Sequence, residues 1–123
     1  MRPERLYLLD MVDAAEAIAE HVEGLDRDTF FADRTVRSAV LHELTVIGEA
    51  AARLPSELRD RHSEIPWADI VAFRNLVVHE YFGLSWPIVW ITATADVPSL
   101  HRKIVAIVDA EFPAAQDEPL GGP

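Results

Sequence analysis

Apolar residues recur every three or four positions along most of the chain, and this period constrains the fold more than any other feature. Steps of three and four place successive side chains on one face of an α-helix, whereas a strand needs strict alternation. No alternating stretch of useful length and no Asn-Gly or Asp-Gly hairpin pair occurs. The sequence therefore predicts an all-α protein. Its first apolar stripe consists of Leu8, Met11, Ala15, Ile18 and Val22.

Capping residues and prolines set the expected helix boundaries. Asp33 is a suitable cap for the second long helix, because its short acidic side chain can accept from a free backbone N–H. Pro55 ends this helix, since proline lacks the N–H that a helix interior needs. Residues 55–61 are predicted to form one short helical turn. Pro66 then opens a third main helix that should run to about His79.

The rest of the chain continues the helical pattern to a Pro- and Gly-rich end. Gly83 marks a break, Ser85 is the expected cap of the next helix, and Pro98 is expected to interrupt it. Residues 1–112 are predicted to form one domain, an up-and-down bundle of four to five helices. Residues 113–123 lack periodicity and are expected to be a flexible C-terminal tail.

Composition limits where the protein works and what it binds. The chain has 123 residues, no Cys and a net charge of −10. The absence of cysteine excludes disulfides and thiolate sites, and no apolar run approaches the ~18 residues needed to cross a bilayer. We therefore expect a cytoplasmic protein without a membrane partner. A chain this acidic repels polyanions at long range, so binding of nucleic acid would require a local basic site.

Arg74 falls inside the apolar stripe of the third main helix. An arginine in that position pairs with an acid, extends to a rim or lines a cleft. Glu49 is a reasonable partner, because it follows Gly48 in the middle of the second helix. A helix-interior glycine costs about 1 kcal/mol relative to alanine, which favours a position where two helices approach closely.

Asn75 and His79 lie four residues apart on a different face of the same helix, and Tyr81 follows. Taken singly, Arg74 suits an ion pair, His79 a partly exposed histidine and Tyr81 a packing residue. Together they have the chemistry that metal-free RNA cleavage needs. Arginine binds phosphate in a bidentate manner, and histidine exchanges a proton near neutral pH.

The residues from Arg74 to Tyr81 resemble the Arg-x4-His-x-Tyr signature of the HepT-like branch of the HEPN superfamily. Further segments match the family in the same order and spacing: residues 47–51 and 64–67 before the motif, and a Phe-Gly pair and Trp90 after Tyr81. The resemblance covers nearly the whole chain, from about residue 5 to residue 110. It implies a HEPN-like homodimeric bundle that is the toxin of a toxin–antitoxin pair.

The family resemblance also implies an activity, a partner and roles for individual residues. Similar proteins are metal-independent endoribonucleases, and their antitoxin is a minimal nucleotidyltransferase that in some pairs adenylylates the motif tyrosine. By position, Arg74 and His79 would be catalytic, Asn75 would assist them, and Tyr81 would accept the adenylyl group.

The spacing of the motif adds a geometric expectation. Arg74 and His79 are five residues apart, about 140° around an ideal helix and ~7.5 Å along it, so they do not share a face. We hypothesise that two copies of this helix meet at a twofold axis and combine both pairs in one groove. Glu49 is expected either to orient Arg74 or His79 from behind, or to form a purely structural ion pair.

Other patterns in the sequence give weaker evidence for a functional site. His42 begins a zinc-type H-E-x-x-H pattern, but Val46 occupies the position of the second ligand, so we expect no metal and no cofactor. Trp86 is the tryptophan with the best case for contact with RNA. Arg34 and Arg37 suit surface solubility, or contact with RNA or the antitoxin.

A second hypothesis needs no catalysis. The chain would then be a helical protein-interaction or regulatory dimer, in which the same motif residues form a buried polar network that fixes the register. The acidic charge fits this alternative better than it fits an RNA-binding enzyme.

Overall fold

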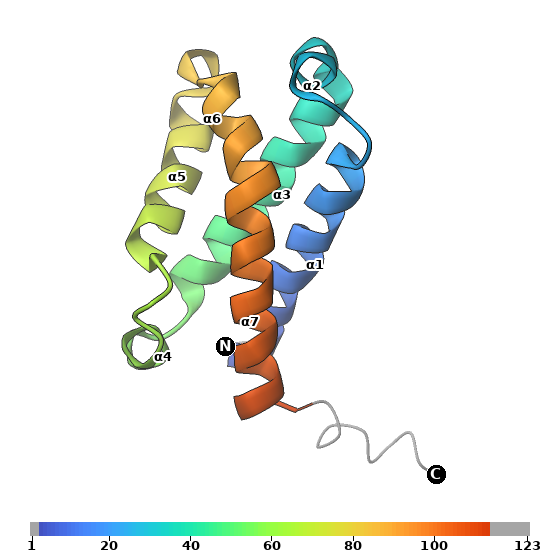
Figure 1. Cartoon of the computed structure of the whole chain (residues 1–123). Helices are drawn as coiled ribbons and strands as arrows, with labels where there is room; N and C mark the ends of the chain where they lie inside the picture. The colour runs from blue at the N-terminus through green and yellow to red at the C-terminus, as the bar shows by residue number, and fades with distance from the viewer. Residues whose placement is uncertain (1–2, 114–123) are drawn as a thin grey trace.

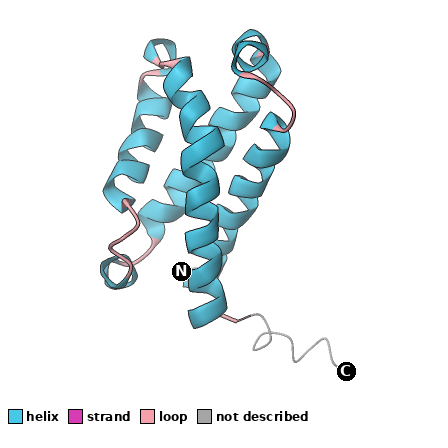
Figure 2. Ribbon diagram, viewed as in Figure 1, coloured by secondary structure: helices cyan, strands magenta, loops and turns pink. Residues whose placement is uncertain are grey.

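The computed structural model describes residues 3–113, which are helical almost throughout and contain no strand (Figure 2). The long helices run alternately up and down, with the short helices at the two ends of the bundle (Figure 1). This architecture confirms the predicted all-α class. The four long helices are α1 (Glu4–Val22), α3 (Arg34–Arg53), α5 (Trp67–His79) and α7 (Val97–Glu111).

The expected number of helices is too low, because the short helix α2 (Arg27–Ala32) was missed. A six-residue helix is too short to show a period of its own. Its signal is instead the cap Asp26, whose side chain accepts a hydrogen bond of 2.8 Å from the N–H of Thr29. Phe30 of this helix is fully buried in the core. The other short helices are α4 (Ser56–Arg61) and α6 (Trp86–Ile91).

The expected caps are confirmed. The carboxylate of Asp33 accepts from the N–H of Val36 at 3.1 Å and begins α3. The hydroxyl of Ser85 accepts from the N–H of Ile88 at 3.4 Å and begins α6. Gly24 has a φ of 77°, the left-handed conformation that ends α1.

The sequence had suggested that Pro98 interrupts the last helix, but the helix continues through it. α6 passes through a π-helical segment, η2 (Thr92–Asp96), directly into α7. At the end of this segment the N–H of Val97, the first residue of α7, donates to the carbonyl of Thr92, five residues earlier. Pro98 then occupies the first turn of α7. The wider turn changes the hydrogen-bond pattern just before the residue that has no N–H to donate, so the helix continues.

Apolar residues of all the α-helices form the core between them, and four residues of the predicted first stripe belong to it: Leu8, Met11, Ala15 and Ile18. Within residues 3–113 no polar or charged side chain is fully buried, and none of the helices there combines the length and hydrophobicity needed to span a membrane. The predicted tail lies outside the described residues, apart from Pro113. The largest fully buried side chains are Phe30, Leu8, Met11, Ile18, Leu54, Leu58, Ile65, Ile104, Val40 and Val89.

Candidate active site

The motif-bearing helix α5 lies at one edge of the bundle, on the left in Figure 1. Its principal neighbour is α3, on which it packs along one face. Trp67 and Val77 are its buried residues. Apolar residues such as Leu76 and Val78 also lie outside the buried face, so complete burial would need a neighbour on both sides. A single chain does not achieve this, because one neighbouring helix covers only one face.

At Gly48 the helices α3 and α5 approach so closely that no side chain fits. A Cβ at this position would lie 2.2 Å from the Cβ of Arg74 and 2.6 Å from its Cγ. Non-bonded carbon atoms ordinarily stay about 3.5–4.0 Å apart. The prediction that Gly48 permits a close helix contact is confirmed, and the residue it meets is the motif arginine.

Arg74 is paired with Glu49 across this contact. Its Nη1 donates to the Glu49 carboxylate, and Arg53 lies 3.6 Å from the other oxygen of the same carboxylate. The Arg74 side chain is 21% exposed and that of Glu49 is 44% exposed, so the pair lies at the mouth of the α3–α5 contact and remains open to solvent. The Nε of Arg74 is buried and has no hydrogen-bond partner among the described residues.

Asn75 and His79 lie on the outer face of α5, away from α3. Both are exposed, and they follow the same side of the helix as Ala68, Ala72 and Leu76. Leu76 is 45% exposed although it is apolar. Within one chain the structure therefore places Arg74 on the inner side of α5 and His79 on the outer side, as their spacing predicts.

Tyr81 lies beyond the end of α5, in the single 3₁₀ turn η1 (Tyr81–Gly83). Its ring is 42% exposed and meets Trp86 edge to face, with ring centroids 6.4 Å apart. Its neighbour Phe82 is fully exposed. The motif tyrosine is thus accessible at the surface, separate from the Arg74–Glu49 pair.

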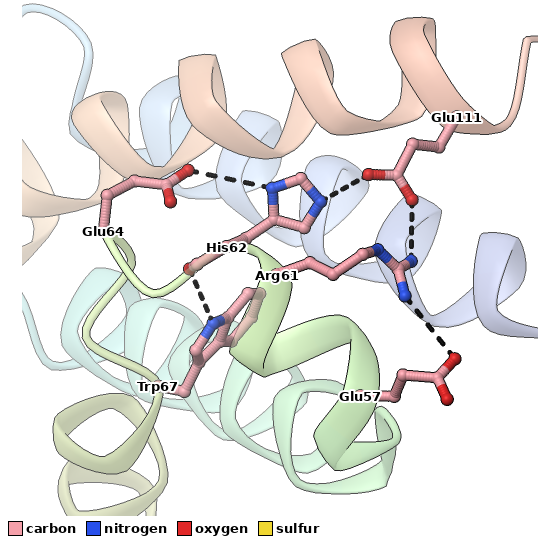
Figure 3. Close-up of polar contacts among 6 residues, drawn as sticks. All are labelled: Glu57, Arg61, His62, Glu64, Trp67 and Glu111. Carbon is pink, nitrogen blue, oxygen red and sulfur yellow. Dashed lines mark hydrogen bonds and ion pairs between the residues drawn. The ribbon is translucent and has the colours of Figure 1, made fainter.

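The start of α5 is anchored by a cluster of polar side chains at the opposite end of the helix (Figure 3). The indole N–H of Trp67 donates to the carbonyl of His62 at 3.1 Å. The His62 ring lies between two carboxylates, 2.5 Å from Glu111 and 3.8 Å from Glu64. Arg61 donates to Glu111 at 2.8 Å. The cluster ties the segment before α5 to the last turn of α7.

Hydrogen bonds and charges within this cluster shift the pKa values of Glu111 and Arg61. The hydrogen bond from Arg61, assisted by His62, holds the pKa of Glu111 below its ordinary value. In return, the hydrogen bond to Glu111 raises the pKa of Arg61. Both directions favour the charged forms and therefore the tie between α4 and α7.

A groove beside α5 is separate from the motif residues. It has a volume of about 370 Å³, lies between α3, α5 and the π-helical start of α7, and has lining residues that include Ile47, Phe73 and Leu100. None of the motif residues Arg74, Asn75, His79 and Tyr81 lines it. Within the described part of the chain, His, Asp and Glu side chains form no group of three able to hold a metal ion.

Comparison with known proteins identifies the family. Residues 11–107 match the family model described as "HepT-like: Ribonuclease HepT-like". The chain is 34% identical over 111 residues to "Putative RNase TTE0752" of Caldanaerobacter subterraneus subsp. tengcongensis, covering 90% of this chain and 99% of that protein. It is also 34% identical over 102 residues to "Probable ribonuclease HepT" of Thermococcus cleftensis, covering 83% of this chain and 93% of the relative. No solved structure matches the chain. With the Arg-x4-His-x-Tyr motif on the edge helix α5 and the turn that follows it, the chain belongs to the HepT-like ribonuclease family.

Proposed function

We propose that the protein is a metal-independent endoribonuclease that cleaves RNA by attack of a ribose 2′-hydroxyl on the adjacent phosphate. The observation that carries this proposal is the placement of an arginine, an asparagine and a histidine on α5, a helix whose outer face is uncovered. These side chains supply a phosphate ligand, a hydrogen-bonding group and a proton carrier without any metal.

The roles follow from the chemistry of each group. His79 acts as general base and takes the proton of the 2′-hydroxyl, whose oxygen then bonds to phosphorus. The bond from phosphorus to the 5′-oxygen breaks, that oxygen takes a proton, and a 2′,3′-cyclic phosphate remains. Arg74 binds the phosphate and stabilises the charge that accumulates on it, and Asn75 positions the reacting groups.

A homodimer formed through α5 completes this site. In one chain Arg74 and His79 point to different sides of the helix, so a second copy is needed to bring an imidazole to each guanidinium. The exposed stripe of Ala68, Ala72 and Leu76 supports such a contact, because small and apolar residues let two helices approach closely. The second copy's His79 would then serve as the general acid.

The same motif supports a role in a toxin–antitoxin pair of type VII-like organisation, acting in the cytoplasm. The partner would be a minimal nucleotidyltransferase that silences the nuclease by transferring an adenylyl group to Tyr81. The exposure of the Tyr81 ring suits this reaction, since its hydroxyl must reach the active site of another protein. Incubation with the neighbour-encoded nucleotidyltransferase and ATP should add one AMP-sized mass at Tyr81; mass at another residue, or none, would contradict the proposal.

Cleavage of RNA in EDTA tests the enzymatic proposal. The purified parent protein should cut single-stranded RNA and leave cyclic phosphate ends, whereas His79→Ala should lose cleavage and retain its helicity and dimer mass. His42→Ala is the matched control, because His42 is an exposed histidine on α3 outside the motif. Equal cleavage by His79→Ala and the parent would remove the catalytic role of His79.

The acidic charge of −10 and the pairing of Arg74 with Glu49 favour a second candidate, a non-catalytic interaction or regulatory dimer. In that case the ion pair serves to fix the dimer register. Arg74→Ala separates the two functions. A nuclease should lose cleavage and stay folded, whereas an interaction module should show no cleavage in the parent and a large loss of stability in the variant.

A further inference from the structure

Arg37 is held against an aromatic ring instead of a carboxylate. Its guanidinium carbon lies 4.7 Å from the centroid of the Trp86 ring. Arg53, Arg61 and Arg74 each lie beside a glutamate, but Arg37 has no carboxylate at ion-pair distance among the residues that the structure describes. In a chain of net charge −10, a guanidinium left free of acids is available to an outside anion.

Trp86 is itself fixed in place. Its ring meets the buried Phe30 of α2 and the ring of Tyr81 in η1, both edge to face with centroids 6.4 Å apart. Arg37 of α3 covers the indole, and its Nε is buried without a hydrogen-bond partner in the described part of the chain. Contact with a fixed ring restrains the guanidinium before any ligand arrives, so less rotamer freedom is lost on binding.

Arg37 also lies on the same line of α3 as the motif contact. Arg37 and Gly48 are eleven residues apart, which is three helical turns, about 20° from the same direction and roughly 16 Å along the axis. Gly48 is where Arg74 meets α3. The side of α3 that faces α5 therefore meets Arg74 at Gly48 and carries Arg37 nearer its start, where both Arg37 and Tyr81 contact Trp86.

We infer that Arg37, positioned by Trp86, binds a phosphate of the RNA strand at a distance from the scissile bond. This inference rests on the proposed nuclease function and extends it to a substrate contact outside the motif. The contact recognises the backbone, so it should strengthen binding of all sequences alike. It also supplies a local basic site that an acidic chain needs in order to hold a polyanion. Arg37 touches no reacting atom, so its effect belongs to binding.

Binding of a short fluorescein-labelled single-stranded RNA of mixed sequence tests the inference. Its 2′-hydroxyls are methylated so that it cannot be cleaved, and anisotropy is measured over a range of salt concentrations. Arg37→Gln should weaken binding by roughly tenfold. It should also reduce the slope of log affinity against log salt by about 0.7, the value for one phosphate contact on a single strand. Arg37→Lys should bind with an affinity between those of the parent and Arg37→Gln, because it keeps the charge and loses the planar guanidinium over the indole.

Arg102→Gln is the matched control, since it removes the same charge from an exposed position on another helix, α7. It should leave the salt slope unchanged. With unmodified RNA, Arg37→Gln should raise KM and leave kcat close to that of the parent. Thermal unfolding should show that Arg37→Gln is folded.

Two results would overturn the inference while leaving the nuclease proposal intact. One is an Arg37→Gln protein that cuts RNA and binds it with the affinity and salt slope of Arg102→Gln. The other is loss of binding to poly-glutamate with RNA binding unchanged, which would assign Arg37 to an acidic protein partner. A parent protein that neither binds nor cuts any RNA would instead contradict the nuclease proposal itself, and the Arg37 contact with it.

Discussion

Replacing Gly48 by alanine tests the contact on which the site geometry depends. The added Cβ would lie 2.2 Å from the Cβ of Arg74, an atom fixed to the backbone that cannot rotate away. To restore an ordinary contact, α3 and α5 must separate by about 1.3 Å at this point. Arg74 would move with α5, and its contact with Glu49 would change.

Two opposing terms set the expected loss of stability. Overpacking a tight contact costs about 1–3 kcal/mol. Alanine in place of glycine in a helix interior raises the free energy of unfolding by about 1 kcal/mol. The free energy of unfolding should therefore fall by about 0–2 kcal/mol, as measured by urea denaturation. RNA cleavage should fall much further, by roughly a hundredfold, because a displacement of about 1 Å in a catalytic group is costly.

A second background makes the steric argument decisive. In a protein carrying Arg74→Gly, the two side-chain carbons that a Cβ at position 48 would meet are gone, and the nearest remaining contact, to the Cα of residue 74, is an ordinary 3.5 Å. Gly48→Ala should then stabilise the protein by about 1 kcal/mol. Ala52→Gly, at an exposed position of the same helix, calibrates that helix term. A loss of stability of the same size in both backgrounds would refute the steric explanation.

Three further substitutions test other parts of the same geometry. Leu76→Asp places a charge in the exposed stripe of α5 and should weaken the proposed dimer at least tenfold, measured by light scattering against dilution; an unchanged dimer mass would move the interface elsewhere. Glu49→Gln should lower cleavage by up to roughly a hundredfold while circular dichroism stays unchanged, and loss of folding would favour the purely structural ion pair. The lowered pKa of Glu111 means that its stabilising contribution is present above the ordinary glutamate pKa and is lost as the pH falls through the folded value. Glu111→Gln should therefore show a lower Tm at neutral pH and a shallower decline in acid, and parallel acid declines would contradict this.

Much of the fold was predictable because its signals are local. The stripe of α1 repeats every three or four residues, and the caps at Asp33 and Ser85 bond to residues three positions later. The short helix α2 escaped prediction because six residues hold no repeat. Pro98 was misleading because a π-helical turn before it removes the conflict that proline normally causes, and such a turn has no simple sequence signal.

For the candidate site, the sequence by itself determined which motif residues are present and predicted their chemistry. It supplied the motif and its separation around one helix, and it indicated Gly48 and Glu49 as the place and the partner of the Arg74 contact by their position in α3. Only the tertiary structure decided that α5 lies at the edge of the bundle with an uncovered face, that the Arg74–Glu49 pair stays open to solvent, and that Arg37 lies over the ring of Trp86. The physical reason is one of range. Periodicity and capping act between neighbours along the chain, whereas exposure and stacking depend on which distant helix packs against which.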